Sequence, residues 1–107
     1  MYIYRLKDYI GSIVYIGITD NINRRISQHI KNKKTKGIEI IEYYFNDDEF
    51  YIKRLEQYLI HKYKPKKNKL IYSVDDVTLE PKESEWKAYG EWYKKRTCRS
   101  FKFFRWD

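Results

Sequence analysis

The stretch YIYRLKDYIGSIVYIGITDNINRRISQH, residues 2–29, decides the fold. Residues 2–6 and 13–19 are rich in β-branched and aromatic residues, which favour strands. Asp8 and Gly11 lie between these two runs and are typical turn residues. The pattern predicts a β-hairpin at the start of the chain.

A helix is predicted directly after the hairpin, with Asp20 as a suitable N-cap. Isoleucines recur every four residues up to about Lys31 and would form one stripe of that helix: Ile22, Ile26 and Ile30. A lysine-rich loop over 32–37 then leads to a third β-rich run over 38–45.

The next segment carries both a helix start and a helix stop. Asn46 followed by Glu49 resembles a capping box, and Pro65 excludes the right-handed helical conformation at Lys64. The apolar stripe between them consists of Ile52, Leu55, Leu59, Ile60 and Tyr63. The order β, β, α, β, α predicts a mixed α/β domain in which the hairpin needs the third strand and the helices for stability.

The rest of the chain has weaker patterns. Residues 70–79 could form one strand or two short ones, and Ser84 could cap a third helix. Aromatic residues at helical spacing support that helix: Trp86, Tyr89 and Tyr93. Residues 101–106 resemble a short terminal strand or an aromatic clasp. We therefore divide the chain into a core over 1–68 and a basic, aromatic extension over 69–107 that packs on it.

Composition limits the classes of function. The chain has 107 residues and a formal net charge of +8, so we expect one domain that attracts polyanions, with nucleic acid as the first candidate. A basic composition also serves solubility, so charge favours this partner without establishing it. Cys98 is the single cysteine, and no apolar run is long enough to span a membrane. With no signal-peptide pattern, we expect a soluble cytoplasmic protein.

One carboxylate is misplaced for a purely structural role. At about 100° per residue, Glu56 falls in the middle of the apolar stripe of the second long helix. Removing an unpaired carboxylate from water costs several kcal/mol, roughly, so Glu56 must be paired, protonated, at a cleft opening or bound to a cation. A hydrogen bond to a core tyrosine or arginine is the structural alternative.

Arg25 and His29 share a face of the first helix. A guanidinium suits two phosphate oxygens, and an imidazole one turn away can hydrogen-bond a second group or transfer a proton. The alternative is a solvated basic edge beside a core histidine.

Tyrosines in the hairpin have a related ambiguity, because tyrosine is ordinary core filler in strands. Tyr2 and Tyr4 share one side of their strand, and Gly17 removes a side chain from the face that carries Tyr15. We interpret that missing side chain as space for a substrate backbone, with a bulge or close helix packing as the alternative.

Several other chemistries lack support. The one cysteine and two histidines have no zinc-ligand spacing, and the four glycines form no phosphate-binding loop. No serine or cysteine has a recognisable base partner.

Taken in order, these residues form a specific pattern. Tyr2-Ile3-Tyr4 is followed by Tyr15-Ile16-Gly17, and then by four polar residues: Arg25, His29, Glu56 and Asn68. The pattern resembles the GIY-YIG endonuclease family over residues 1–68. In the first triplet, Tyr2 stands where the family has glycine, whereas the tyrosine that matches the family's catalytic group, Tyr4, is present.

The resemblance implies a fold, a reaction and a set of roles. The fold would be a small α/β (α+β) domain with a three-stranded antiparallel sheet flanked by helices. Glu56 would bind one Mg²⁺ or Mn²⁺ ion, and Arg25 would hold the scissile phosphate. Tyr4 or Tyr15 would accept a proton from the attacking water, His29 would orient a tyrosine or assist proton transfer, and Asn68 would brace the site.

The expected substrate is DNA, duplex or branched, cut by a monomer or homodimer that could be phage-encoded. Basic residues would contact it: Lys31, Lys33, Lys34, Lys36, Lys66, Lys67, Lys94, Lys95 and Arg96. Residues 84–107 interleave aromatic and basic side chains, which suits either DNA contact or covering of the core. Two other hypotheses are a catalytically silent nucleic-acid-binding module and a protein that binds a partner through its aromatic tail.

Overall fold

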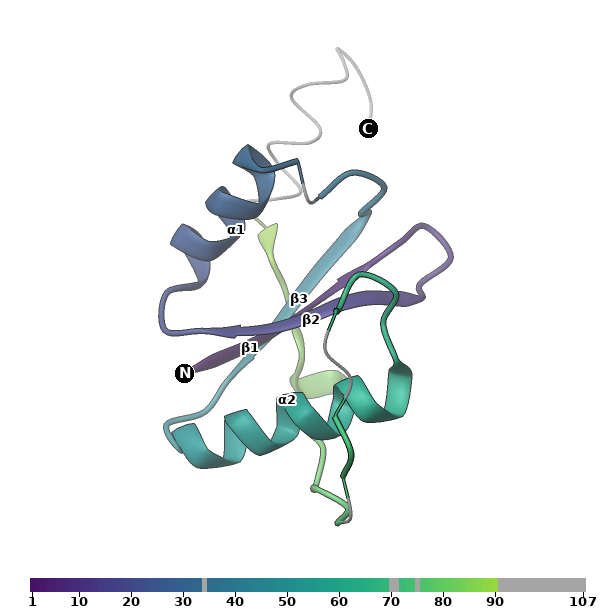
Figure 1. Ribbon diagram of the computed structural model, residues 1–107. Helices are drawn as coiled ribbons and strands as arrows, with labels where there is room; N and C mark the ends of the chain where they lie inside the picture. Colours follow the sequence, from purple (N-terminus) through teal and green to yellow (C-terminus); the bar gives the residue numbers. More distant parts are fainter. Residues whose placement is uncertain (34, 70–71, 75, 91–107) are drawn as a thin grey trace.

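The computed structural model describes residues 1–33, 35–69, 72–74 and 76–90. The elements in chain order are β1 (Tyr2–Lys7), β2 (Ile13–Thr19), α1 (Ile22–Lys31), β3 (Ile40–Phe45), α2 (Glu49–Tyr63), a 3-10 turn (Glu83–Glu85) and β4 (Lys87–Ala88). The predicted order of hairpin, helix, strand and helix is confirmed, and so is the α+β class (Figure 1). In the described residues, no helix is long and apolar enough to cross a membrane.

The sheet is antiparallel, with the strand order β2-β1-β3-β4. Three strands were expected, and the fourth is the short β4, which pairs with Glu42 and Tyr43 of β3. Two residues carry no readable alternation, so β4 could not be predicted from its own sequence. Among the described residues, the order leaves β2 at one edge of the sheet, with β1 as its only neighbouring strand.

The hairpin contains a β-bulge. Leu6 pairs with Tyr15 while Lys7 pairs with Ile13, so Val14 is an extra residue in β2. Val14 and Tyr15 consequently contact the same hydrophobic core, and Ile13 contacts the other. The bulge therefore keeps apolar residues on both faces of β2 buried.

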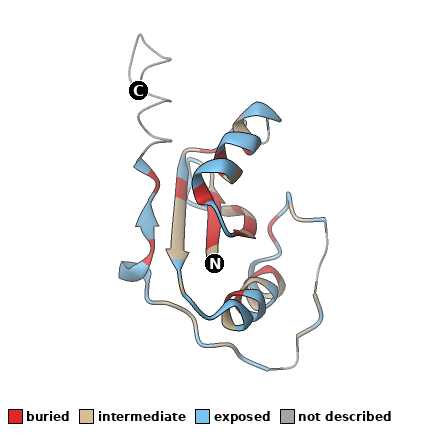
Figure 2. Cartoon of the chain, turned by 90° about the vertical axis from the view of Figure 1, so that its left-hand side faces the viewer, coloured by how far each residue is buried: buried red, intermediate tan, exposed pale blue. Residues whose placement is uncertain are grey.

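The helices cover opposite faces of the sheet. Tyr4 and Leu6 of β1 pack in one core with Ile22 and Ile26 of α1. Ile3, between those two residues, packs in the other core with α2, through Ile52, Leu55, Leu59 and Ile60. Because neighbouring residues of a strand point to opposite faces, α1 and α2 lie on different sides of the sheet. Figure 2 shows buried residues on the strands and exposed ones on the outer sides of both helices.

The start of α1 differs from the prediction by one residue. Asn21, not Asp20, is the N-cap, and its side chain accepts a hydrogen bond of 3.0 Å from the backbone of Arg24. Asp20 instead forms a 2.9 Å ion pair with the Arg24 guanidinium. Both residues can cap a helix, and the hydroxyl of Thr19, which accepts from the Asn21 backbone, helps to fix the choice.

Asp48 caps α2, so the predicted Asn46 cap is wrong. The Asp48 side chain accepts a 3.1 Å hydrogen bond from the backbone of Tyr51, and Asn46 in turn accepts one from the backbone of Asp48. The end of α2 is as predicted from Pro65: Lys64 leaves the helix in the left-handed conformation, with φ of 46°.

The segment after α2 departs from the predictions. Residues 72–74 and 76–79 contain no strand, and Ser84 lies in the 3-10 turn and caps no α-helix. Trp86 and Tyr89 are three residues apart on extended backbone, so their side chains enter opposite cores: Trp86 the α2 side and Tyr89 the α1 side. A spacing of three suits a helix, but it also suits a strand buried on both faces. Tyr93 and residues 101–106 lie outside the described residues.

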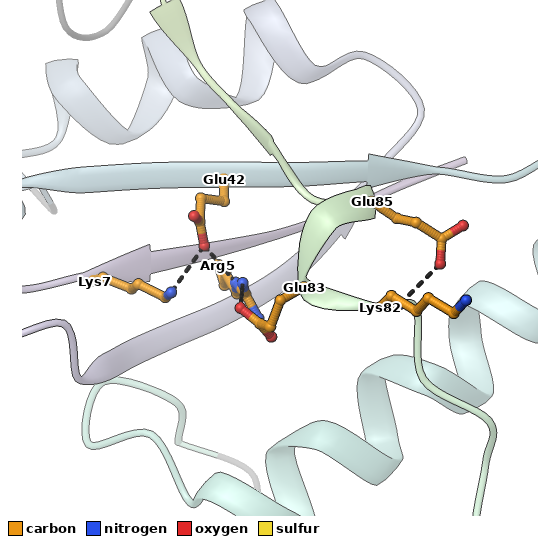
Figure 3. A network of polar contacts seen from close by, with 6 residues as sticks. All are labelled: Arg5, Lys7, Glu42, Lys82, Glu83 and Glu85. Atoms are coloured by element: carbon orange, nitrogen blue, oxygen red, sulfur yellow. Dashed lines mark hydrogen bonds and ion pairs between the residues drawn. The ribbon is translucent and has the colours of Figure 1, made fainter.

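A buried arginine fastens this segment to the sheet. The side chain of Arg5 is 4% exposed, and its guanidinium pairs with Glu42 at 2.7 Å and with Glu83 at 2.7 Å. It also lies 4.0 Å from the centre of the Trp86 ring. Lys7 pairs with Glu42 at 3.0 Å (Figure 3). Burial favours the neutral form of Glu42, but hydrogen bonds from Lys7 and Arg5 outweigh it and hold the pKa of Glu42 below its ordinary value.

We predict that Arg5→Met lowers the free energy of unfolding by about 3 kcal/mol, because it leaves Glu42 half-buried with Lys7 alone and detaches Glu83. Urea denaturation at neutral pH measures this. Arg24→Met is the matched control, since it breaks an exposed pair within one helix turn and should cost less than about 0.5 kcal/mol. Equal losses in the two variants would contradict a structural role for the Arg5 network.

Candidate functional site

The site begins with a close approach between β1 and β2. Tyr4 pairs with Gly17 in the hairpin, and the Tyr4 ring is fully buried. A Cβ atom at position 17 would lie 2.4 Å from the Tyr4 hydroxyl and 2.6 Å from Cζ. The space left by the missing side chain is thus filled by the Tyr4 phenol, and our interpretation of it as room for a substrate backbone is wrong. Gly17 is required so that the phenol can cross over β2.

The Tyr4 hydroxyl is hydrogen-bonded to a histidine of α1. Its oxygen lies 2.7 Å from Nε2 of His29, which is itself buried. Burial raises the pKa of Tyr4 well above its ordinary value; Tyr15 raises it further and Arg25 opposes this. The phenol therefore keeps its proton at neutral pH, and the direction of its hydrogen bond with Nε2 follows from the tautomer of His29.

Tyr15 and Arg25 complete the group. The Tyr15 ring lies 5.4 Å from that of His29 and 6.1 Å from that of Tyr4. Tyr15 and Arg25 are half-buried, unlike the sealed Tyr4. Within the described part of the chain, Nε of Arg25 is the one buried side-chain nitrogen or oxygen without a hydrogen-bond partner. Buried polar atoms usually have a hydrogen-bond partner, so this nitrogen is available to donate to an acceptor on a bound ligand.

The side chain of Asn68 forms hydrogen bonds with the outer edge of β2. Its side-chain amide donates 2.9 Å to the carbonyl of Ile16, and its side-chain oxygen accepts 2.9 Å from the Ile16 backbone N–H. The backbone of Lys67 adds a 3.0 Å hydrogen bond to the carbonyl of Val14. Residues 67 and 68 thus replace a neighbouring strand at this edge and fix β2 between Tyr15 and Gly17. The Lys67 contact could not be predicted from the sequence, because it uses only backbone atoms.

Glu56 lies on α2, on the other side of the sheet from Tyr4 and His29. It is half-buried, and burial raises the pKa of its carboxyl above the ordinary value. Among the described residues, no cation offsets this effect and no side chain pairs with Glu56. The predicted desolvation problem is therefore present, whereas the alternative of a bond to a core tyrosine or arginine is not seen there. Its joint action with Tyr4, Tyr15 and Arg25 stays a prediction.

The metal prediction can be compared with the available ligands. In the part of the chain that the structure describes, no three histidine, cysteine or acidic side chains gather into a metal-binding group. A single carboxylate with hard oxygen atoms is nevertheless compatible with Mg²⁺ or Mn²⁺, which commonly bind through one or two carboxylates, water and substrate phosphate. The residues fit an ion that the substrate helps to hold.

Two of the predicted basic segments meet beside the site. The Lys67 ammonium donates a 3.1 Å hydrogen bond to the carbonyl of Lys36, which joins the loop after α1 to the segment after α2. The lysines of these segments are exposed: Lys31, Lys33, Lys36, Lys66 and Lys67. We call these five residues the basic rim. Lys34, Lys94, Lys95 and Arg96 lie outside the described residues.

Comparison with known proteins supports the resemblance. The family model of the GIY-YIG catalytic domain matches residues 1–70. UvrABC system protein C of Thermoanaerobacter sp. (strain X514) is 35% identical over 78 residues, which are 64% of this chain and 13% of that protein. The protein of the same name from Clostridium botulinum (strain Hall) is 32% identical over 91 residues, 72% of this chain and 15% of that protein. The chain thus matches only a small part of these relatives, and no solved structure matches it.

We predict that Gly17→Ala lowers the free energy of unfolding by about 1–3 kcal/mol, because the new methyl group displaces the Tyr4 phenol from His29. In a Tyr4→Leu background the ring tip is gone, so the two losses should be non-additive by about 1 kcal/mol or more. Chemical denaturation of the four proteins of this cycle gives the coupling. Gly90→Ala is the control, since no atom of the described residues lies within 4 Å of a Cβ atom there. If the losses in stability from Gly17→Ala and Tyr4→Leu are strictly additive, the close contact between position 17 and the Tyr4 ring does not contribute to stability.

Proposed function

Because the chain belongs to the GIY-YIG catalytic domain family, a family of nucleases, we propose that it is a divalent-metal-dependent endonuclease that hydrolyses DNA phosphodiester bonds. The observation that carries the proposal is the buried, unpartnered Nε of Arg25 next to the Tyr4–His29 pair. A phosphate oxygen is the acceptor that such a nitrogen lacks, and a guanidinium binds phosphate through two parallel hydrogen bonds. Arg25 would hold the scissile phosphate over β2.

We assign different tasks to the two tyrosines. Tyr4 is sealed from solvent and hydrogen-bonded to His29, so we assign it the role of positioning the site. Tyr15 stays partly accessible and lies beside both rings, so it is the better candidate to accept a proton from the attacking water. The positive charge of Arg25 would stabilise the phenolate that results. Asn68 would keep Tyr15 in place through the backbone of Ile16.

Glu56 would bind one Mg²⁺ or Mn²⁺ ion. When bound, such an ion supplies positive charge to a phosphate oxygen and to the leaving oxygen. Glu56 and the tyrosine cluster belong to opposite faces of the sheet, so the substrate would reach both around the free edge of β2. α2 packs mainly on β2, which brings Glu56 to that edge strand rather than to the far side of the sheet. A half-buried carboxylate without a cationic partner supports this role.

The basic rim would hold the DNA backbone. It flanks Asn68 and the outer edge of β2, so a strand crossing that edge would meet it. The formal charge of +8 adds a long-range attraction to any polyanion. One site makes one cut, so a monomer would nick DNA, and a homodimer would be needed for a concerted double-strand break. The relatives are UvrABC system proteins, but their match covers this domain only, so the activity of the whole relatives is not carried over.

We predict that the protein nicks supercoiled plasmid in the presence of Mg²⁺ or Mn²⁺, and that Arg25→Met and Glu56→Gln each lower the rate by about 100-fold or more. Arg25→Met removes a positive charge, and Glu56→Gln removes the carboxylate that would bind the metal ion. Each positive charge would stabilise the negative charge that develops on the phosphate oxygens in the transition state. Arg24→Met and Glu49→Gln are matched controls from the same two helices, at side chains that are more than half exposed, and should keep near full rates.

The controls also decide between hypotheses. If the two site variants nick as fast as the controls, Arg25 and Glu56 have no catalytic role. If no variant and no wild-type protein nicks any DNA, while all bind it with strong salt dependence, the chain is a silent nucleic-acid-binding module. Weak binding with little salt dependence would instead favour a protein that binds a partner protein.

We further predict that Glu56→Gln is more stable than the wild type at pH 7.5, by up to about 5 °C in Tm. Because the folded pKa of Glu56 is raised, its ionised form opposes folding. That cost is absent below the unfolded pKa of about 4.3, grows as pH rises toward the folded pKa, and is constant above it. The difference in Tm should therefore vanish near pH ~3.5, which thermal melts by circular dichroism can measure.

Metal provides a second measurement on the same pair of proteins. Millimolar Mg²⁺ should raise the Tm of the wild type and leave that of Glu56→Gln unchanged, because a ligand that binds the folded state stabilises it. Glu49→Gln removes a carboxylate that pairs with Lys53 at the start of α2, so it should lower Tm slightly at neutral pH. A wild-type protein more stable than Glu56→Gln at pH 7.5 without metal would overturn this account of Glu56.

A further inference from the structure

Aromatic side chains gather near one end of the sheet, on the face that carries α1. The Tyr2 ring lies 4.9 Å from that of Phe45 and 5.9 Å from that of Tyr43. Phe45 is 49% exposed, so one ring of the group is open to solvent. We call Tyr2, Tyr43 and Phe45 the aromatic platform. Tyr2 stands where the family has glycine, so its ring is an addition that the nuclease fold does not require.

The platform adjoins a hollow at the end of β4. Pairing between β3 and β4 stops at Tyr43 and Lys87, so among the described residues no strand lies beside Tyr44 and Phe45 on the side away from β1. A hollow of about 370 Å³ lies there, lined by Tyr43, Tyr44, Phe45, Glu85 and Lys87. Its volume falls in the range of small-molecule sites.

The polar groups of the hollow suit a nucleotide. Lys87 is exposed and offers a cation to a phosphate. The Glu85 carboxylate accepts a 2.8 Å hydrogen bond from the backbone of Lys82, and its remaining acceptor capacity suits the amino group of a base. An apolar peptide would use neither charge. The combination of an exposed ring, a cation and a net charge of +8 favours a nucleic-acid strand.

Strand geometry places the platform close to the candidate site. Tyr4 faces Gly17 on β2, whereas Tyr2 faces Phe45 on β3, two residues further along the same face of the sheet. Two strand spacings across and two residues along correspond to about 12 Å. At about 3.4 Å per nucleotide along a strand, this is the reach of three or four nucleotides.

We propose that the aromatic platform stacks an unpaired nucleobase of the DNA strand that is cut, a few nucleotides from the phosphate bound at Arg25. This inference rests on the proposed nuclease function and names its substrate class: DNA with an unpaired or displaced base, in preference to a continuous duplex. Stacking on Phe45 carries no strong preference among bases, because each base has an aromatic face.

The test uses the full chain in EDTA, so that binding is read without cutting. The probes are a single-stranded oligonucleotide with 2-aminopurine at one position and the same strand in a complete duplex. With the single strand, fluorescence should fall by about half or more on binding, as expected for stacking. Phe45→Leu should abolish that change and weaken affinity about tenfold. Phe50→Leu is the matched control, since Phe50 is 78% exposed on α2, on the other face of the sheet.

Three outcomes would overturn the proposal. Phe45→Leu and Phe50→Leu could behave alike, the wild type could bind single strand and duplex equally, or the fluorescence could stay constant while Phe45→Leu melts far earlier than Phe50→Leu. The last result would mean that Phe45 serves the stability of the fold and does not stack a base. The two proposals can be tested separately. Plasmid nicking without Phe45-dependent quenching would contradict base stacking on the aromatic platform and leave the nuclease function intact. Quenching without nicking would contradict the nuclease function and leave the stacking intact.

Discussion

The phenol of Tyr4 occupies the space that any side chain at position 17 would need, and the rest of the site depends on this steric constraint. The hairpin register sets Tyr4 opposite Gly17, and the missing Cβ lets the ring cross β2 to reach His29 at 2.7 Å. That hydrogen bond ties α1 to the sheet at the turn of the helix that also carries Arg25. A glycine, a buried phenol and an imidazole thus determine where the guanidinium lies.

The sheet order gives the edge strand a second function. In the part of the chain that the structure describes, β2 pairs with a strand on one side only, and a sheet edge of this kind can pair with other chains. Asn68 and the backbone of Lys67 close it over Val14 and Ile16 without adding a strand. Because α1 and α2 cover opposite faces, this edge is where groups from both sides of the sheet can approach one substrate. Residues 67 and 68 therefore protect the edge of β2 at the place where we propose that the substrate binds.

The hairpin, both long helices and the family could be predicted from the sequence because local patterns determine them. Alternating β-branched residues define β1 and β2, the isoleucine stripe defines α1, and Pro65 defines the end of α2. The N-caps were missed by one or two residues because Asp20 and Asn21, like Asn46 and Asp48, are chemically equivalent candidates. The fate of Trp86 and Tyr89 depends on contacts more than 40 residues away in sequence, with Arg5 and Ile41, and no local pattern encodes those. The same limit applies to the site: parity placed Tyr15 and Gly17 on one face of their strand, but only the folded structure shows that the Tyr4 ring, not a substrate, fills the space.

Glu42 and Glu56 are both half-buried, but their pKa values shift in opposite directions. Glu42 is half-buried and held ionised by Arg5 and Lys7, so its charge is neutralised within the fold and its pKa is lowered. Glu56 is also half-buried, but its pKa is raised because nothing among the described residues offsets the loss of water. A structural carboxylate would gain stability from a partner one turn away on its own helix, such as Lys53, yet Lys53 pairs with Glu49. Keeping an uncompensated charge costs stability, and a cation brought together with the substrate is the compensation that the geometry leaves open.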